Sequence, residues 1–261
     1  MDRSIDAEAW RRHYDNGEVV AEYARESALQ PPEAAIVAEI GPALREARLL
    51  DIGVGAGRTT RHLAPLCREY VGIDYAASMI AACRKTFEPL LRAGRARFEL
   101  ADARALPFSD AAFEAVMFSF NGIDYVPAAQ RTQVLRECRR VLTAGGVFVF
   151  STHNLEWLAS LRHVRFRGSL TRLVEEARFW AGMRSLNRAA WPIDDRDALA
   201  LREPGSDGFL TFYDRPKCTV AALEEAGFTG VRFFDLAGRE AGVEAAGRLT
   251  DPWLYVLCRA A

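Results

Sequence analysis

Hydrophobic and polar positions follow two different patterns along the chain, and the change between them falls near Arg48. Before that point the chain predicts short helices, one of them over residues 18–29. Pro31-Pro32 interrupts this helix, and Pro32 is suited to the first position of the next one. We expect that next helix to end at Gly41-Pro42.

From Arg48 onward, apolar runs of strand length alternate with segments of helical period. The apolar runs cover residues 49–52, 70–73, 96–100, 115–120 and 147–151. Between them, Met79, Cys83, Phe87 and Leu91 recur four residues apart, as the buried face of a helix does. Nearly all-apolar strands that alternate with helices are typical of a parallel sheet covered on both faces. The pattern predicts an α/β fold with a doubly wound sheet.

Residues 155–210 break this rhythm and are predicted to be a helical insertion. The stretch is rich in Arg and Trp and indicates two or three helices around a loop at Trp191-Pro192. After it, residues 219–226 predict a helix that Gly227 closes, and two further strands are expected. The predicted units are an N-terminal helical segment (1–45), a core (46–154), the insertion (155–210) and a C-terminal part of the core sheet (211–261).

The composition fits one large globular domain and limits the classes of partner. The chain has 261 residues, 50% of them hydrophobic, and a formal net charge of −1. Proteins that bind nucleic acid usually carry an excess of Lys and Arg. The near-neutral net charge shows no such excess, so nucleic acid is not the expected partner. The acidic N-terminus differs from a signal peptide, and no run approaches the roughly 20 apolar residues of a membrane span. Five scattered cysteines without a C-x-x-C pair indicate reduced thiols in a cytoplasmic protein.

The strongest chemical signal is the segment Asp51-Ile52-Gly53-Val54-Gly55-Ala56-Gly57-Arg58, which joins a buried strand to a helix. Glycines in such a turn adopt positive φ angles and let the backbone approach a ligand closely. A dinucleotide fingerprint needs a small residue at the sixth position counted from Gly53. Arg58 occupies that position, which argues against a nicotinamide cofactor.

Two acidic residues follow the next two predicted strands. Asp74 ends the second strand about twenty residues after the glycine turn, where a carboxylate accepts hydrogen bonds from both ribose hydroxyls of an adenosine. Asp102 lies just past the third strand, on the adenine side of the same crevice. The four histidines show no metal-ligand spacing such as H-x-x-x-H, so no metal is expected.

In this order and spacing, these segments resemble class I S-adenosylmethionine (SAM)-dependent methyltransferases. Residues 113–117 and 139–148 are similar to that family's fourth strand and to its turn into the fifth. The resemblance covers about residues 48–150, and more loosely 220–258. It implies a Rossmann-like, mostly parallel seven-stranded sheet whose last two strands form an antiparallel pair at one edge. It also implies an enzyme with SAM as cofactor.

The resemblance assigns cofactor-binding roles to residues at the strand ends. It implies that Asp74 holds the ribose and that Asp102 meets the adenine amine, with the adjacent Tyr75 and Ala103 as further contacts. The methionine part would lie on the glycine turn and be oriented by Asp51. The remaining implied contacts are Gly53, Gly55 and Gly57 of that turn, and Phe118 and Ser119 beside the sulfonium.

Residues 118–125 and 151–154 are similar to a bacterial subset that acts on small molecules or glycan precursors. His153 follows the fifth strand and is a candidate base for a hydroxyl, with a hydrogen-bonding role as the alternative. Asp124, a second candidate catalytic residue, and Tyr125 could orient the acceptor or simply pack the loop. Tyr14 and Tyr23 are interpreted as parts of an N-terminal lid over the cofactor, with helix packing as the alternative.

The insertion carries a cationic run with few acids. Its arginines are Arg162, Arg165, Arg167, Arg172, Arg178, Arg184 and Arg188. They form either a solvated helix face or a substrate cap that recognises an acidic or phosphorylated acceptor. The expected reaction is methyl transfer to an O or N atom of a small molecule or glycan precursor. The alternatives are an RNA or protein methyltransferase and a protein that binds SAM without catalysis, and the sequence carries no signal for an oligomeric state.

Overall fold

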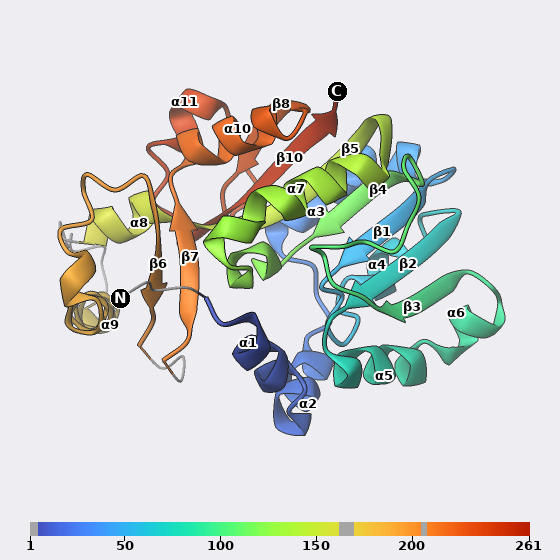
Figure 1. Ribbon diagram of the computed structural model, residues 1–261, viewed down its shortest axis with the longest axis horizontal. Coiled ribbons are helices and arrows are strands. Elements are labelled where there is room, and N and C mark those ends of the chain that lie inside the picture. Colours follow the sequence, from blue (N-terminus) through green and yellow to red (C-terminus); the bar gives the residue numbers. More distant parts are fainter. Residues whose placement is uncertain (1–4, 162–169, 205–207) are drawn as a thin grey trace.

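In the computed structural model, strands from the whole chain form one mixed sheet (Figure 1). The structure describes residues 5–161, 170–204 and 208–261. The spatial order is β3-β2-β1-β4-β5-β10-β8-β9, while β7 pairs with β5 and β6 pairs with β7. The strands are β1 Arg48–Ile52, β2 Glu69–Asp74, β3 Ala96–Leu100, β4 Phe113–Phe118, β5 Leu142–Asn154, β6 Ala198–Arg202, β7 Leu210–Asp214, β8 Phe228–Phe234, β9 Glu240–Ala241 and β10 Trp253–Ala260.

The first five strands are parallel, as predicted for a doubly wound fold. Strand β1 pairs with β2 and β4, β2 pairs with β3, and β4 pairs with β5. Val116 and Phe118 of β4 point into one hydrophobic core, while Ala115 and Met117 point into the other. Both faces of the sheet are therefore buried, which explains why these strands are nearly continuous apolar runs.

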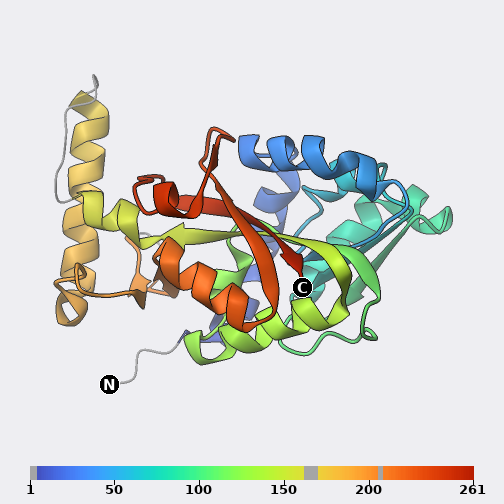
Figure 2. The same ribbon diagram turned by 90° about the horizontal axis from the view of Figure 1, so that it is seen from above.

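Helices cover both faces of the sheet, and Figure 2 shows α3 and α7 on opposite sides of it. Helices α3, α4 and α5 pack on one core, and α7, α10 and α11 pack on the other. The helices are α1 Ala7–Tyr14, α2 Gly17–Arg25, α3 Pro31–Leu44, α4 Thr60–Leu63, α5 Ala77–Thr86, α6 Glu88–Arg92, α7 Ala128–Val141, α8 Leu155–Ser160, α9 Leu170–Leu186, α10 Pro216–Glu225 and α11 Val243–Ala246, with 3₁₀ turns η1 Gly122–Tyr125 and η3 Arg188–Ala190.

The number of strands corrects the seven-stranded expectation. Within the described residues the sheet has ten strands, and the additional ones are β6, β7 and β9. The insertion is also not purely helical, because β6 lies inside it and forms an antiparallel hairpin with β7. Non-local pairing decides this outcome: β7 pairs in parallel with His153 and Asn154 of β5, beyond the point where β4 ends.

The N-terminal helix α3 corrects another boundary. It begins at Pro31 and continues through Gly41-Pro42 to Leu44. Ile36, Ile40 and Leu44 are all buried in the core against the sheet. Tertiary packing of this face outweighs the hydrogen bond that a proline inside a helix removes.

The C-terminal segment completes the sheet. Helix α10 is followed by Gly227 at φ 89°, as predicted for its closing residue. Strands β8 and β10 form the expected antiparallel pair. Strand β10 lies between β5 and β8, so the pair is inside the sheet, and the short β9 forms the edge.

Candidate functional site

A cavity of about 790 Å³, open to solvent, lies at the carboxyl ends of β1, β2 and β4. This is the edge where parallel α/β sheets bind ligands, because strand ends and loops converge there. Its lining residues are Ala7, Tyr14, Tyr23, Ile52, Gly53, Gly55, Asp74, Tyr75, Met79, Ala101, Asp102, Ala103, Arg104, Phe118, Ser119, Phe120, Gly122, Tyr125, Val126 and Pro127. The sequence analysis did not single out Met79, Arg104, Phe120 or Gly122 as site residues.

The glycine turn forms the floor of this cavity. Gly53 and Gly55 line it with φ angles of 65° and 55°, which other residues rarely adopt. A Cβ atom on Gly53 would lie 3.0 Å from the Phe118 ring. Gly57 is not part of the lining. A Cβ atom there would lie 2.2 Å from the Phe87 ring, so Gly57 packs behind the turn, and its contact with the cofactor stays a prediction.

Asp74 presents a buried carboxylate at the end of β2. Its Oδ2 accepts a hydrogen bond from the Gly55 backbone N–H at 2.9 Å, and its Oδ1 accepts one from Ala76 N–H at 2.9 Å. Burial raises the pKa of Asp74 to about 6, although these backbone donors act in the opposite direction. Each oxygen retains a further lone pair for a ligand in the cavity.

Asp51 lies behind the glycine turn and outside the cavity lining. Its Oδ2 accepts hydrogen bonds from the Thr59 and Tyr70 hydroxyls, both at 2.5 Å. Burial raises the pKa of Asp51 to about 6, against the effect of these two donors. The carboxylate thus ties β1 to β2 and to the residue before α4.

Asp102 and Ala103 line the opposite end of the cavity. The Asp102 carboxylate forms a 2.5 Å ion pair with Arg104. Burial raises the pKa of Asp102, but the hydrogen bonds from Arg104 outweigh burial and lower it overall. Arg104 is also the one cation among the lining residues, so the described part of the cavity carries no cation without an acidic partner.

Aromatic side chains from the N-terminal helices cover the cavity. Tyr14 and Tyr23, from α1 and α2, lie edge to face with ring centroids 5.7 Å apart. Trp10 of α1 packs against Tyr125 with the two rings tilted and their centroids 4.2 Å apart, and it donates from its Nε1 to the Leu210 carbonyl at 3.2 Å. Helix α1 therefore connects the cavity to the β6–β7 hairpin. Trp10 was missed because the sequence gives only its helical position.

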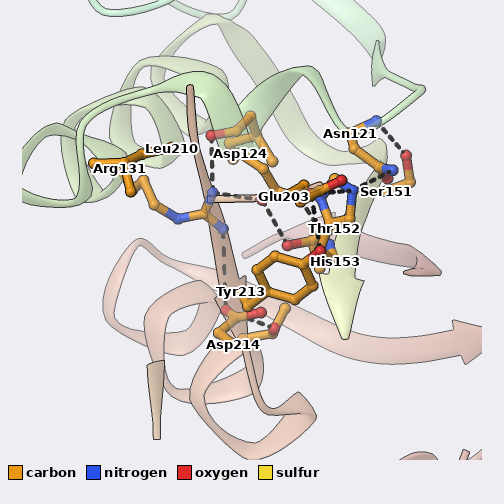
Figure 3. A network of polar contacts seen from close by, with 12 residues as sticks. Asn121, Asp124, Arg131, Ser151, Thr152, His153, Glu203, Leu210, Tyr213 and Asp214 are labelled. Carbon is orange, nitrogen blue, oxygen red and sulfur yellow. Dashed lines mark hydrogen bonds and ion pairs between the residues drawn. The ribbon is translucent and has the colours of Figure 1, made fainter. Parts of the chain in front are cut away.

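The two predicted residues Asp124 and His153 are brought together in one network of polar contacts, which Figure 3 shows. The Asp124 side chain is fully buried, and the His153 side chain is 10% exposed. Oδ2 of Asp124 lies 2.7 Å from both the backbone N and Nδ1 of His153. Its Oδ1 accepts from Thr152 at 2.8 Å and from Arg131 at 2.7 Å. The His153 backbone N–H, the Thr152 hydroxyl and the Arg131 guanidinium all donate to this carboxylate, whose oxygens act as acceptors. We therefore assign the hydrogen of His153 to Nδ1, which leaves a lone pair on Nε2.

Further polar groups surround this pair. Nε2 of His153 lies 3.5 Å from Nδ2 of Asn121 and 4.0 Å from a carboxylate oxygen of Glu203. Arg131 also lies 4.0 Å from Asp214, whose pKa burial raises to about 6. Neither His153 nor Asp124 lines the cavity itself, whereas Ser119, Phe120, Gly122 and Tyr125 do. Asn121 is the residue that links the cavity loop to His153, and the sequence analysis did not single it out.

The cationic run of the insertion is not part of this site as far as the structure describes it. Arg162, Arg165 and Arg167 lie outside the described residues, as does the side chain of Arg172. Arg178, Arg184 and Arg188 do not line the cavity. Arg184 and Arg188 instead border a separate surface hollow beside Trp180 and Trp191. Figures 1 and 2 show α9, which carries Arg178 and Arg184, at the end of the molecule opposite β3.

The described residues contain neither a cluster of metal-ligating side chains nor a membrane-spanning helix. Within residues 5–161, 170–204 and 208–261, no group of three or more His, Cys, Asp or Glu side chains could hold a metal ion. In the same ranges no helix has the length and apolar character needed to cross a membrane. All five cysteines are free thiols.

Comparison with known proteins identifies the class. Residues 49–146 match the methyltransferase domain family. The chain is 30% identical over 197 residues, 73% of its length, to a ubiquinone/menaquinone biosynthesis C-methyltransferase of Geobacter sp. (strain M21), covering 74% of that protein. It is 34% identical over 262 residues, 95% of its length, to a malonyl-[acyl-carrier protein] O-methyltransferase of Halorhodospira halophila, covering 82% of it.

Solved structures share the fold. A SAM-dependent methyltransferase from Mesorhizobium loti superimposes with a TM-score of 0.58 at 18% identity, over 87% of this chain and 97% of that one. The 1,6-didemethyltoxoflavin-N1-methyltransferase of Burkholderia thailandensis gives a TM-score of 0.61 at 17% identity, over 98% of this chain and 87% of that one. The chain belongs to the class I SAM-dependent methyltransferases, and it is an enzyme that uses SAM.

The cavity fits this cofactor. Asp74 offers buried acceptor lone pairs where a ribose needs them, and a glycine floor leaves room for close backbone approach. Aromatic rings at Phe118, Tyr23 and Tyr75 surround the remaining space, which suits a positively charged sulfur.

Proposed function

We propose that this enzyme transfers a methyl group to an O or N atom of a small-molecule acceptor. The observation that carries the proposal is the character of the cavity: its walls are mainly aromatic and aliphatic, and its one cation is paired with Asp102. An RNA backbone or an anionic acceptor would require unpaired cations at such a site. Two similar proteins named above are a quinone-pathway methyltransferase and a toxoflavin-precursor methyltransferase, which supports a small acceptor.

The proposed cofactor contacts follow the lining of the cavity. Asp74 and Tyr75 would hold the ribose, Asp102 and Ala103 the adenine, and the backbone of Gly53 and Gly55 the methionine part. Phe118, Ser119 and Tyr14 would surround the sulfonium. When bound, SAM supplies a methyl group already activated by the positive charge on sulfur. The protein therefore has to align the acceptor and exclude water.

His153 is proposed as the base that removes the acceptor's proton, and Asp124 as the residue that orients it. Hydrogen bonds at 2.7 Å from the His153 backbone N–H and from Nδ1 to Asp124 fix the ring in one tautomer. The Nε2 lone pair is then directed away from Asp124, toward Asn121 and Glu203. A neutral imidazole held in this way can take a proton as the new bond forms.

Residues 1–45 are proposed to act as a lid, and residues 155–210 as a cap. Trp10 holds the lid in place through its ring contact with Tyr125 and its hydrogen bond to Leu210, which belongs to the β6–β7 hairpin. Opening of these contacts would widen the access to the cavity. Residues 46–154 together with 211–261 then form the SAM-binding core.

The test is a single-turnover methyl-transfer assay with a panel of small hydroxyl and amine compounds, with the demethylated cofactor measured by mass spectrometry. His153→Asn keeps a donor for Asp124 but removes the basic nitrogen. It should lower the rate by about 10²- to 10⁴-fold while SAM affinity stays unchanged. A loss below about 5-fold, outside the usual range for a base, would contradict the role of His153. Absence of transfer to every compound, with SAM bound, would contradict the proposed function.

A further inference from the structure

The side-chain oxygen of Asn121 is a buried acceptor without a hydrogen-bond partner. Asn121 is 6% exposed, and its Oδ1 has no partner among the residues that the structure describes. The rest of the residue is well held: its backbone N–H donates to the Ser151 hydroxyl at 2.8 Å, and its Nδ2 faces Nε2 of His153. Buried polar atoms in native proteins are nearly always paired, so an unpaired one on the loop whose neighbouring residues line the cavity indicates a place for a ligand donor.

The backbone around Asn121 is unusual in a way that supports a role in the site. Phe120 and Asn121 have φ angles of 57° and 60°, two consecutive non-glycine residues in the left-handed region. Such conformations cluster at functional sites, where the surrounding structure maintains them. Here they bend the chain as it leaves β4. Phe120 and Gly122 consequently line the cavity, while the side chain of Asn121 extends toward His153 on β5.

The orientation of the Asn121 amide follows from the hydrogen-bond network. Asp124 accepts from three other donors, so the hydrogen of His153 is assigned to Nδ1 and Nε2 is an acceptor. A donor must face that lone pair, which places the amide nitrogen of Asn121 toward His153 and leaves Oδ1 for another partner. In Figure 3, Asn121 and His153 lie together at the end of β5, with Glu203 beside them.

The three groups at this point all present lone pairs. They are Nε2 of His153, Oδ1 of Asn121 and the carboxylate of Glu203, which lies 4.0 Å from Nε2 and also accepts from the Tyr213 hydroxyl at 2.8 Å. A carboxylate acceptor would meet only acceptors and negative charge there. A hydroxyl or an amine would donate its hydrogen instead.

We propose that Asn121 binds the methyl acceptor by accepting a hydrogen bond from its reactive O–H or N–H group, which restricts the acceptor class to neutral hydroxyls and amines and excludes carboxylates. The inference rests on the proposed function of the same site. In the transfer, a lone pair of the acceptor O or N forms the bond to the methyl carbon. The sulfur–carbon bond breaks with its electron pair remaining on sulfur. The acceptor's proton leaves its hydrogen bond to Oδ1 of Asn121 and passes to Nε2 of His153, which gives up its contact with the Asn121 amide.

The test uses enzyme loaded with the demethylated cofactor, S-adenosylhomocysteine. The three probes are phenol, aniline and benzoate, which share a benzene ring and differ only in the group attached to it. In ¹⁵N-labelled protein, the side-chain NH₂ resonance of Asn121 should shift with phenol and aniline but not with benzoate. The matched control is Asn187, a buried asparagine in the insertion whose amide is bonded to Met183 and Arg202. Its resonance should not shift with any probe.

Two variants separate binding from folding. Asn121→Gly tolerates the positive φ and removes the acceptor, and it should bind phenol about 10-fold more weakly with cofactor affinity and melting temperature maintained. Asn121→Asp keeps an oxygen at this position and should retain phenol binding. Benzoate binding as strong as phenol, no binding of phenol and aniline, or unchanged phenol affinity in Asn121→Gly would each overturn the proposal. Failure of the methyl-transfer assay with these binding results intact would overturn only the proposed function.

Discussion

Nδ1 of His153 lies 2.7 Å from Oδ2 of Asp124, and the same carboxylate joins three elements of the fold. His153 and Thr152 contribute from β5, Asp124 from η1 and Arg131 from α7. The Arg131 side chain is only 11% exposed. One carboxylate therefore both orients the proposed base and compensates a largely buried cation.

This arrangement predicts a double effect of Asp124→Asn. The amide cannot accept from all four groups, and it leaves Arg131 with only Asp214, 4.0 Å away, as a charged partner. Unfolding by urea should show a loss of about 3–5 kcal/mol, the usual cost of breaking a buried pair, together with slower methyl transfer per folded molecule. The double variant with Arg131→Met should recover part of the stability but not the rate. Full recovery of the rate would show that Asp124 acts only through folding.

Asp74→Asn should weaken cofactor binding while the protein stays folded. The amide still accepts from Gly55 N–H but presents no negative charge to the ribose hydroxyls. Hydrogen bonds to charged groups are worth about 1.5–3 kcal/mol, so calorimetry should show a Kd roughly 10- to 100-fold higher. Asp235→Asn is the matched control, because Asp235 is equally buried but is bonded to Arg239 away from the cavity. Equal affinity losses in the two variants would reject the ribose role.

Cofactor affinity should also depend on pH. Burial raises the pKa of Asp74 to about 6, so the free enzyme protonates this group as the pH falls through that value. Binding that requires the ionised carboxylate is complete above pH 6 and is lost below it, by up to about tenfold per pH unit for one proton. Calorimetry with S-adenosylhomocysteine between pH 8 and 5 checks this. The pH profile of cofactor affinity should be flatter in Asp74→Asn. This variant retains Asp51, whose pKa is also raised to about 6, so the comparison separates the two carboxyl groups.

Gly57→Ala should destabilise the fold more than Gly94→Ala does. Both glycines have positive φ angles, 91° and 66°, but only at Gly57 would the new Cβ atom meet a neighbour, the Phe87 ring at 2.2 Å. Strain alone costs about 1–2 kcal/mol, and overpacking adds about 1–3 kcal/mol. Urea unfolding should therefore separate the two variants by at least about 1 kcal/mol. Adding Phe87→Leu to Gly57→Ala should reduce the difference.

The sequence by itself determined the core of this protein. The continuous apolar runs predicted the parallel strands because both faces of the sheet are buried, and the glycine turn with Asp74 and Asp102 predicted the cofactor edge because strand ends converge there. These features are local, because each depends only on a few residues that lie close together in the sequence at a fixed spacing. The resemblance to class I methyltransferases rested on the same local segments.

Only the tertiary structure decided the rest. The extension of α3 past Pro42 depends on the packing of Ile36, Ile40 and Leu44 on the sheet. Strand β6 forms because it pairs with β7, which itself pairs with the end of β5. The position of Gly57 behind the turn depends on Phe87, thirty residues along the chain. The contact between Asn121 and His153 requires both the left-handed exit from β4 and the register of β4 on β5. Long-range pairing fixes all of these, and no local pattern of hydrophobic and polar residues encodes which distant segments meet.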